Sequence, residues 1–306
     1  MPRSTQSTPS PALVLAAFAA VYVIWGSTYL AIRFAVEELP PFLIAGIRFV
    51  VAGSVLFLWA WLKREPRPVG REAGSAAVGG LLLLLGGNGA VVWAQQFVPS
   101  GATALIVATV PLWMVLLEWA RPGGRRPRAG VFVGLALGLA GIALLLDPSA
   151  SLDARVDPVG ALVLCLGSVS WAAGSIYMRS VAMPRSALAS NATQMLAGGV
   201  GLLLLAGVMG EPARMDLAAA SSRAIASVVY LIVFGSLIGY TAYTFILRVS
   251  TPARASTYAY VNPVVAVVLG WAFAGEQITW RTIGAAGVIL AGVAIITLSS
   301  PARTSR

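Results

Sequence analysis

Charged and ionisable side chains are scarce in this sequence. Only 10% of its 306 residues are charged, histidine is absent, and Cys165 is the one cysteine. A lone cysteine excludes an intramolecular disulfide and a thiol metal site. An average soluble domain carries about 25% charged residues, so the low charge also argues against a soluble fold. We expect no metal, no cofactor and no enzyme activity, because the apolar stretches hold no acid pair, histidine cluster or activated cysteine.

Long apolar runs dominate what is present. Hydrophobic residues make up 58% of the chain, and the mean hydropathy is +0.85. A membrane-spanning helix needs about 20 predominantly apolar residues. The sequence therefore predicts an all-α integral membrane protein with ten transmembrane helices, embedded in the lipid bilayer. The predicted spans are residues 12–34, 42–62, 74–97, 100–120, 129–146, 158–180, 187–209, 224–248, 253–274 and 281–299.

The basic residues are distributed unevenly about these spans. If the N-terminus is cytoplasmic, 15 of the 21 Lys and Arg residues lie inside, five lie outside, and Arg48 lies within a span. Most acidic residues fall on the opposite side. The positive-inside rule then predicts a cell (inner) membrane protein with both termini cytoplasmic, including short tails at 1–11 and 300–306. This distribution explains the net charge of +10 without nucleic acid, which we do not expect as a partner.

The chain contains an internal repeat. WGSTYLAIR at 25–33 returns as WAAGSIYMR at 171–179, and LAGIALL at 139–145 returns as LAGVAII at 290–296. Repeated segments in the same order indicate a duplicated structural unit.

The repeat predicts two halves, residues 12–146 and 158–299, each with five spans. Because five is odd, the second half must enter the membrane from the opposite side. Inverted repeats of this kind recur in secondary transporters, where the substrate site lies at the repeat interface near the bilayer centre. The topology therefore predicts alternating access.

Several short segments carry a family resemblance. The Arg48–Phe49 pair in the second span and the Gly275–Glu276 pair after the ninth look like features of the EamA half-domains of the drug/metabolite transporter superfamily. Further segments resemble the YedA-type inner-membrane exporters: WGSTYLAIR (25–33), PPFLIAGIRF (40–49), GNG (87–89), VPSG (98–101), ATVPL (108–112), SVSWAAGS (168–175) and TYAYVNPVVAV (257–267). The resemblance implies a ten-helix carrier that exports small metabolites or drugs.

Neutral polar and aromatic residues recur within the predicted spans. Such groups can simply join helices by hydrogen bonds, and tryptophan is also enriched at the bilayer surface. Their spread over several spans favours a lined cavity, because aromatic rings with polar tips suit amphipathic solutes. Trp25 and Trp171 occupy equivalent depths in the two halves. The candidate substrate-binding residues are Trp25, Thr28, Tyr29, Asn88, Gln95, Trp171, Ser175, Tyr240, Tyr243, Tyr258 and Asn262.

Two charged residues and two prolines complete the candidate set. Arg48 lies inside a span, where it could hold a substrate carboxylate, snorkel outward, or pair with Glu37 or Glu38. Glu118, near the cytoplasmic end of the fourth span, could take part in proton exchange; otherwise the substrate gradient alone would drive transport. Pro111 and Pro263 occupy equivalent positions in the two halves and are predicted to bend their helices.

These features predict a secondary transporter that exports small metabolites, plausibly amino acids or related amphipathic compounds, as a monomer or homodimer. A broad-specificity drug exporter or an importer of the same fold remains open as an alternative. The absence of catalytic groups from the spans argues against a membrane-embedded enzyme that acts on lipid.

Overall fold

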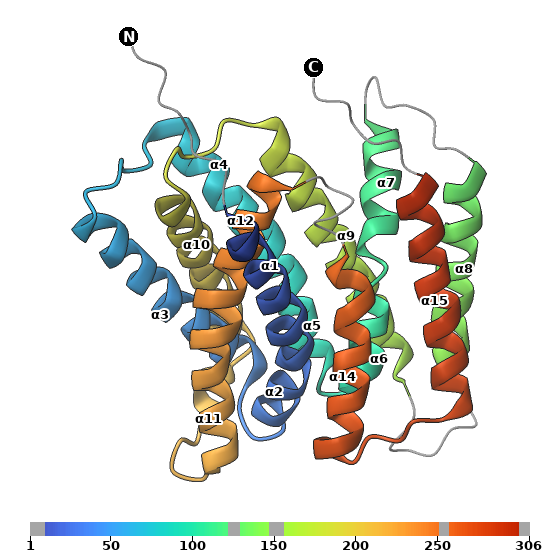
Figure 1. The fold of residues 1–306 in the computed structure, drawn as a ribbon. Helices are drawn as coiled ribbons and strands as arrows, with labels where there is room; N and C mark the ends of the chain where they lie inside the picture. The colour runs from blue at the N-terminus through green and yellow to red at the C-terminus, as the bar shows by residue number, and fades with distance from the viewer. Residues whose placement is uncertain (1–9, 122–128, 147–155, 251–256, 300–306) are drawn as a thin grey trace.

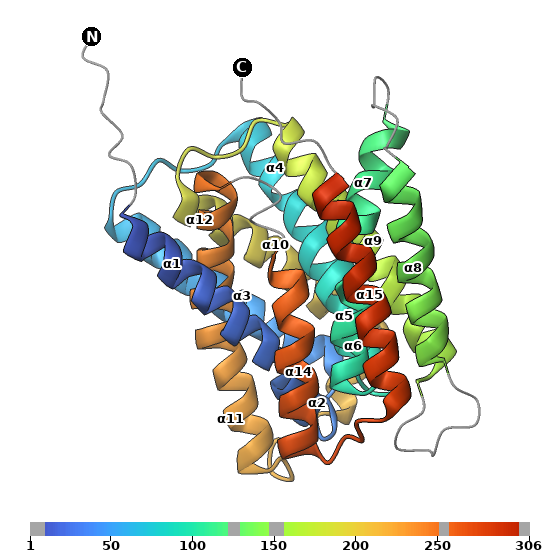
Figure 2. The same cartoon turned by 45° about the vertical axis from the view of Figure 1, so that its right-hand side comes forward.

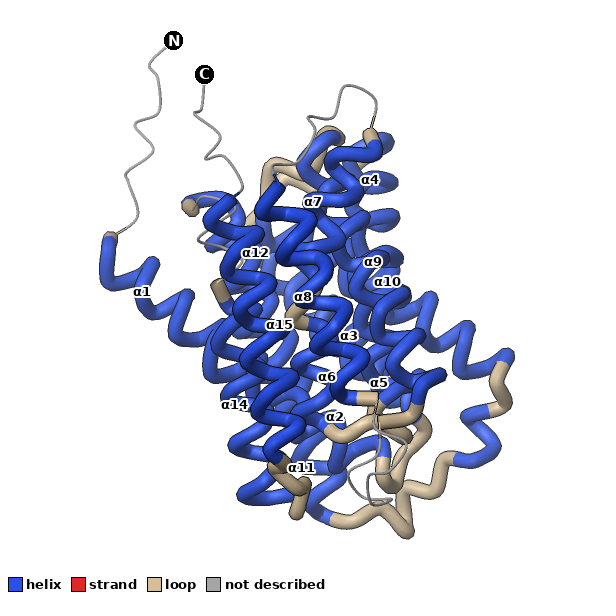
Figure 3. Tube along the Cα trace, turned by 90° about the vertical axis from the view of Figure 1, so that its right-hand side faces the viewer, coloured by secondary structure: helices blue, strands red, loops and turns tan. Residues whose placement is uncertain are grey.

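The structure is a computed structural model that describes residues 10–121, 129–146, 156–250 and 257–299. Every regular element within these ranges is helical, as the tube in Figure 3 shows. The prediction of an all-α protein is therefore confirmed. Most of the two predicted tails, and the start of the predicted span 253–274, lie outside the described residues.

The helices follow one another with short connections, and several predicted spans are built from consecutive helical pieces. Before residue 147 the elements are α1 (Pro11–Ala20), η1 (Val21–Trp25), α2 (Gly26–Val36), α3 (Pro41–Leu62), α4 (Gly70–Gly80), η2 (Leu81–Asn88), α5 (Gly89–Ala94), α6 (Ser100–Val107), α7 (Val110–Ala120) and α8 (Ala129–Leu145). After residue 155 they are α9 (Pro158–Ser180), α10 (Ala187–Val208), η4 (Glu211–Arg214), α11 (Ser222–Tyr230), η5 (Leu231–Tyr240), α12 (Thr241–Val249), α14 (Tyr258–Ala274) and α15 (Trp280–Ser299).

Helices long and apolar enough to cross a membrane account for most of the described residues. Seven qualify: Pro11–Val36, Pro41–Leu62, Gly70–Ala94, Ser100–Ala120, Pro158–Ser180, Ala187–Val208 and Ser222–Leu247. Three shorter apolar helices, Ala129–Leu145, Tyr258–Ala274 and Trp280–Ile295, stand where the other spans were predicted. The number of ten spans stays a prediction.

Local sequence signals explain where several helices begin. The Asp157 carboxylate accepts the backbone N–H of Gly160 at 2.6 Å and so caps α9. Ser186 caps α10, and Ser221 caps α11, in the same way through their hydroxyl groups. These side chains satisfy N–H groups that the first turn of a helix leaves without an intrahelical partner.

Close helix pairs form the scaffold of the bundle. In Figures 1 and 2, α3 crosses α10, and α8 runs alongside α15. Glycines allow the close approach: a Cβ added at Gly199 of α10 would lie 2.8 Å from the backbone nitrogen of Val50 on α3. A Cβ at Gly292 of α15 would lie 2.7 Å from the carbonyl oxygen of Gly134 on α8. A third pair joins α6 to α14.

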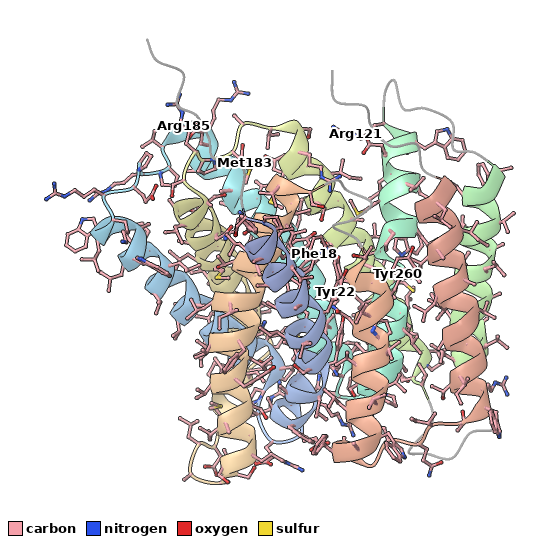
Figure 4. The ribbon with its side chains drawn as sticks, viewed as in Figure 1. Phe18, Tyr22, Arg121, Met183, Arg185 and Tyr260 are labelled. Carbon is pink, nitrogen blue, oxygen red and sulfur yellow. The ribbon has the colours of Figure 1, made fainter. Side chains whose placement is uncertain are left out.

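The two ends of the bundle differ in charge. Helix α1 begins, and α15 ends, at the end that is uppermost in Figure 1. Figure 4 places Arg121 and Arg185 at this same end. Glu37 follows α2, and Glu276 follows α14, at the opposite end. We call these the basic end and the acidic end.

Within the described ranges, three spans contain a π-helical segment: η1, η2 and η5. In a π-helix each N–H bonds the carbonyl five residues back, and such segments are frequent at functional sites. They end at Trp25, Asn88 and Tyr240, and all three of these are candidate site residues. The wider turn rotates the residues that follow it about the helix axis. Regular α-helical spacing therefore does not predict which side chains share a face across these segments.

At the acidic end, Glu38 joins the loop after α2 to the start of α11. Its carboxylate accepts the backbone N–H of Ser221 at 2.6 Å and the Ser221 hydroxyl at 2.7 Å. These two hydrogen bonds hold the pKa of Glu38 below its ordinary value. A carboxyl group with a lowered pKa stabilises the fold above its unfolded pKa, and this stabilisation is lost as the pH falls through the folded pKa.

We expect this contribution to appear in a comparison of wild type with Glu38→Gln. The variant should unfold at a slightly lower temperature than wild type at pH 7, and the gap should close as the pH falls below about 4.3, the ordinary glutamate pKa. The measurement is the unfolding midpoint in detergent between pH 7 and pH 3. Parallel pH profiles for the two proteins would contradict the assignment.

Candidate functional site

Four aromatic side chains contact one another, and we call them the aromatic cluster: Trp25, Trp171, Tyr243 and Tyr258. The Trp25 ring centroid lies 5.9 Å from that of Trp171, 4.8 Å from that of Tyr243 and 5.5 Å from that of Tyr258. Tyr243 also lies 5.7 Å from Tyr258. The edge-to-face geometry of several pairs is the arrangement that aromatic rings prefer.

The cluster brings together side chains from four helical elements. Trp25 closes η1, Trp171 lies in α9, Tyr243 in α12 and Tyr258 opens α14. The polar tips of Tyr243 and Tyr258 converge with Ser175 and with the indole of Trp171. The structure thus brings five of the predicted binding residues into one place.

Helix α1 and its continuation line one side of the cluster. Phe18 and Tyr22, labelled in Figure 4, lie on this helix with their ring centroids 5.9 Å apart. The Tyr22 hydroxyl lies 2.5 Å from the Thr257 hydroxyl. With its amide nitrogen turned toward them, Asn262 donates to the carbonyl oxygens of Tyr22, at 3.2 Å, and Tyr258, at 3.3 Å. Asn262 therefore helps to hold α14 against η1.

Arg48 lies beside the cluster and is only 5% exposed. Its Nε donates to the Ser236 hydroxyl at 2.8 Å, and its guanidinium lies 4.6 Å from the Phe49 ring centroid. Glu37 instead pairs with Arg33 and Arg223. The pairing of Arg48 with Glu37 or Glu38 that the sequence left open is therefore absent from the described structure, and its deep burial is at odds with snorkelling outward.

Glycines of η5 bring Arg48 and the cluster together. A Cβ at Gly235 would lie 2.9 Å from Nη2 of Arg48, and one at Gly239 would lie 2.6 Å from Nε1 of Trp25. The Trp25 indole N–H also donates to the Gly235 carbonyl oxygen at 3.3 Å. Side chains at these two positions would displace both the guanidinium and the indole.

Other candidate residues form two hydrogen-bonded groups. The side-chain amide of Gln95 donates to the backbone carbonyl oxygen of Tyr29 at 2.9 Å, while the backbone carbonyl oxygen of Gln95 accepts from Arg33 at 3.2 Å. The Tyr240 hydroxyl donates to Gln194 Oε1 at 2.6 Å. These contacts fit the alternative role of joining helices. Both groups also adjoin the cluster, because Tyr29 interacts electrostatically with Tyr258, and Tyr240 with Tyr243.

Three further polar candidates use hydrogen bonds differently. The hydroxyl groups of Thr28 and Ser175 donate to carbonyl oxygens of their own helices, those of Trp25 and Trp171. The buried Oδ1 of Asn88 has no hydrogen-bond partner among the described residues. The preceding residue, Gly87, faces Trp171: a Cβ added there would lie 2.9 Å from the Trp171 ring.

The structure gives Glu118 and the two prolines separate positions. Glu118 is exposed in the last turn of α7, a helix that contributes no ring to the cluster. Pro111 lies in the first turn of α7, after a break at Ala108 and Thr109 that separates α6 from α7. Pro263 lies inside α14, which continues past it. The two prolines thus differ in their local structure.

Sequence reasoning missed two carboxylates that join helices at the acidic end. Glu276 accepts the backbone N–H groups of Ser100, at 2.6 Å, and Gly101, at 3.1 Å, at the start of α6. Gly275 turns the chain there with φ of +68°, a conformation that favours glycine. Glu211 accepts the Leu43 N–H at 2.7 Å. For Glu276, the Gly275–Glu276 pair was the feature of the sequence that could have indicated this role.

A separate groove of about 350 Å³ lies between η2, α5 and α9. Gly86, Gly89 and Gly167 are among its lining residues. None of the predicted binding residues lines it, so it is distinct from the aromatic cluster.

Comparison with known proteins places the chain among transporters. The EamA-like transporter family matches residues 11–147 and 158–298. YedA, an uncharacterised inner-membrane transporter of Escherichia coli (strain K12), is 43% identical over 280 residues, which cover 91% of this chain and 89% of YedA. YoaV, an uncharacterised transporter of Bacillus subtilis (strain 168), is 25% identical over 288 residues, which cover 92% of this chain and 95% of YoaV.

A solved crystal structure has the same fold, with 23% sequence identity and a TM-score of 0.64, over 96% of this chain and 99% of that chain. The resemblance that the sequence motifs indicated is confirmed. The chain belongs to the EamA-like transporter family and is a membrane transporter.

Proposed function

We propose that this protein is a secondary transporter of the inner membrane that exports small amphipathic metabolites, such as amino acids, by alternating access. The observation that carries the proposal is the aromatic cluster. It joins Trp25 from the first predicted half to Trp171, Tyr243 and Tyr258 from the second. A site at the interface of two inverted halves is where secondary transporters bind their substrates.

The helix pairs support the inverted arrangement of the halves 12–146 and 158–299. The pairs α3 with α10, α6 with α14 and α8 with α15 each join corresponding spans of the two halves. A two-fold axis in the membrane plane would bring such counterparts together. The basic end, with Arg121 and Arg185 (Figure 4), supports a cytoplasmic position for both termini.

The contacts at the acidic end support a closed state on that side. Helix α2 packs against α6, α11 and α14, and Glu276 ties the end of α14 to the start of α6. In the proposed orientation this side faces away from the cytoplasm. Alternating access requires these contacts to separate before solute leaves.

The position of Glu118 favours transport driven by the substrate gradient. It is exposed at the basic end of α7, outside the aromatic cluster. The charged groups next to the cluster that the described residues supply are cations: the buried Arg48, and Arg179, whose charge acts on Tyr243. A proton relay would normally use a buried acid or histidine.

Alanine in place of Trp25 or Trp171 is expected to lower solute flux about tenfold or more. Each substitution removes more than one aromatic contact, and each aromatic pair contributes about 0.5–1.5 kcal/mol of interaction free energy. The measurement is movement of amino acids, nucleosides and cationic dyes across everted membrane vesicles, with and without a proton gradient. Trp61→Ala is the control, because that ring is 55% exposed on α3.

Two results would contradict the proposal. Unchanged flux in both cluster variants would remove the aromatic cluster from the solute path. Failure of the wild type to move any solute in the panel, together with a covalently changed lipid, would overturn the transport function itself.

A further inference from the structure

We propose that Arg48 forms an anion site that binds the carboxylate of an amphipathic solute whose apolar body lies against the aromatic cluster. The inference rests on the proposed function and adds a substrate class to it. Its starting point is a buried charge. Arg48 is 5% exposed, and an arginine side chain keeps its proton in proteins.

No acidic side chain in the described ranges forms an ion pair with this cation. The described ion pairs join Arg33 and Arg223 to Glu37, and Arg214 to Glu211. The remaining acidic residues near the bundle interior bind backbone groups: Glu38 binds at Ser221 and Glu276 at Ser100. Burying a charge without a counter-charge is costly, so an anionic ligand would offset a cost that the fold itself leaves in place.

Arg48 makes one hydrogen bond, which leaves the other edge of its guanidinium group without a hydrogen-bond partner in the described structure. Nε donates to Ser236, and the described structure gives the two terminal amino groups no hydrogen-bond partner. Ser236 is fully buried, so water does not compete for this bond, which helps to orient the guanidinium. The remaining N–H groups form the planar fork that binds a carboxylate through two parallel hydrogen bonds.

The neighbouring glycines connect this fork to the aromatic cluster. Nη2 lies directly over Gly235, whose carbonyl oxygen accepts the indole N–H of Trp25. Trp25 in turn covers Gly239, four residues further along η5. The Arg48 guanidinium and the Trp25 ring therefore pack side by side on one surface of η5. A solute with a carboxylate joined to an apolar or aromatic body matches both.

The test compares two probes of the same shape on the full-length protein in detergent: 3-phenylpropionate, and its uncharged counterpart 3-phenylpropanamide. Binding is followed by the intrinsic fluorescence of the tryptophans. Charged hydrogen bonds predict that wild type binds the carboxylate about 10- to 100-fold more tightly than the amide. Equal affinity for the two probes would overturn the inference.

Variants assign the preference to Arg48. Arg48→Gln should abolish the preference, so that the carboxylate and the amide bind with equal affinity. Arg48→Lys should restore only part of the preference, because an ammonium group lacks the planar fork. Ser236→Ala keeps the charge but frees the guanidinium plane, so we expect about a threefold loss. Arg214→Gln, an exposed arginine at the acidic end, should behave as wild type.

The outcomes separate this inference from the proposed function. If Arg48→Gln and Ser236→Ala keep the full carboxylate preference, the site is elsewhere and the inference fails. Flux of the uncharged amide into everted vesicles tests transport alone. Wild-type amide flux with no carboxylate preference would leave the transporter standing and overturn only the anion site.

Discussion

Gly80→Ala is expected to reduce the folded yield and to lower the stability of the protein by about 3 kcal/mol, the upper part of the range for overpacking. A Cβ at Gly80 of α4 would lie 2.1 Å from the backbone carbonyl oxygen of Gln194 on α10, and 2.7 Å from two further backbone atoms of that residue. Backbone atoms cannot rotate away as a side chain can. The two helices would therefore have to separate.

The matched control is Gly74→Ala, which makes the same substitution at another glycine of α4. A Cβ there meets nothing within 4 Å. Alanine favours a helix over glycine by about 1 kcal/mol, so this variant should be as stable as wild type or more stable. The measurement is the fraction of monodisperse protein that survives heating in detergent, followed by size-exclusion chromatography. Coincident melting curves for the two variants would contradict the close crossing of α4 and α10.

Glu276→Ala should be the second strongly destabilised variant, by about 3 kcal/mol, because charged hydrogen bonds contribute about 1.5–3 kcal/mol each. The substitution leaves the N–H groups of Ser100 and Gly101 without their acceptor. Ser100 is fully buried, so water cannot replace the carboxylate easily. The same heating assay measures the loss.

Asp216→Ala provides the comparison for Glu276. The Asp216 carboxylate also accepts two backbone N–H groups, those of Ala218 and Ala219, but in an exposed loop. Water can take over these hydrogen bonds, so we expect a change within about 0.5 kcal/mol, as is usual for surface substitutions. Equal losses in the two variants would show that burial at the start of α6 is not the cause.

The sequence was sufficient to predict the fold class and the family, because both depend on short-range information. Apolar runs such as 42–62 give spans directly, and the Arg48–Phe49 and Gly275–Glu276 pairs carry the resemblance. The repeat also gave Trp25 and Trp171 equivalent depths, and the structure brings their rings into contact. Their role in binding solute stays a prediction.

The partners of individual side chains could not be predicted in the same way. Ser236 as the partner of Arg48 depends on the crossing of α3 with η5, and Thr257 as the partner of Tyr22 depends on the register of α14. The π-helical segments add to the difficulty, because each changes the rotation of the residues that follow it. Such features come from tertiary packing and leave no regular spacing in the sequence.

The glycines at the crossing of α3 and α10 restrict how these helices can move relative to each other. A Cβ at Gly46 would lie 3.0 Å from the backbone nitrogen of Leu203, and one at Gly53 would lie 3.0 Å from that of Leu196. Axial sliding by one helical turn, about 5.4 Å, would bring larger side chains such as Val50 into these notches. Shear between the two helices is therefore blocked, and we expect the pair to move as a single rigid body in the proposed alternating access.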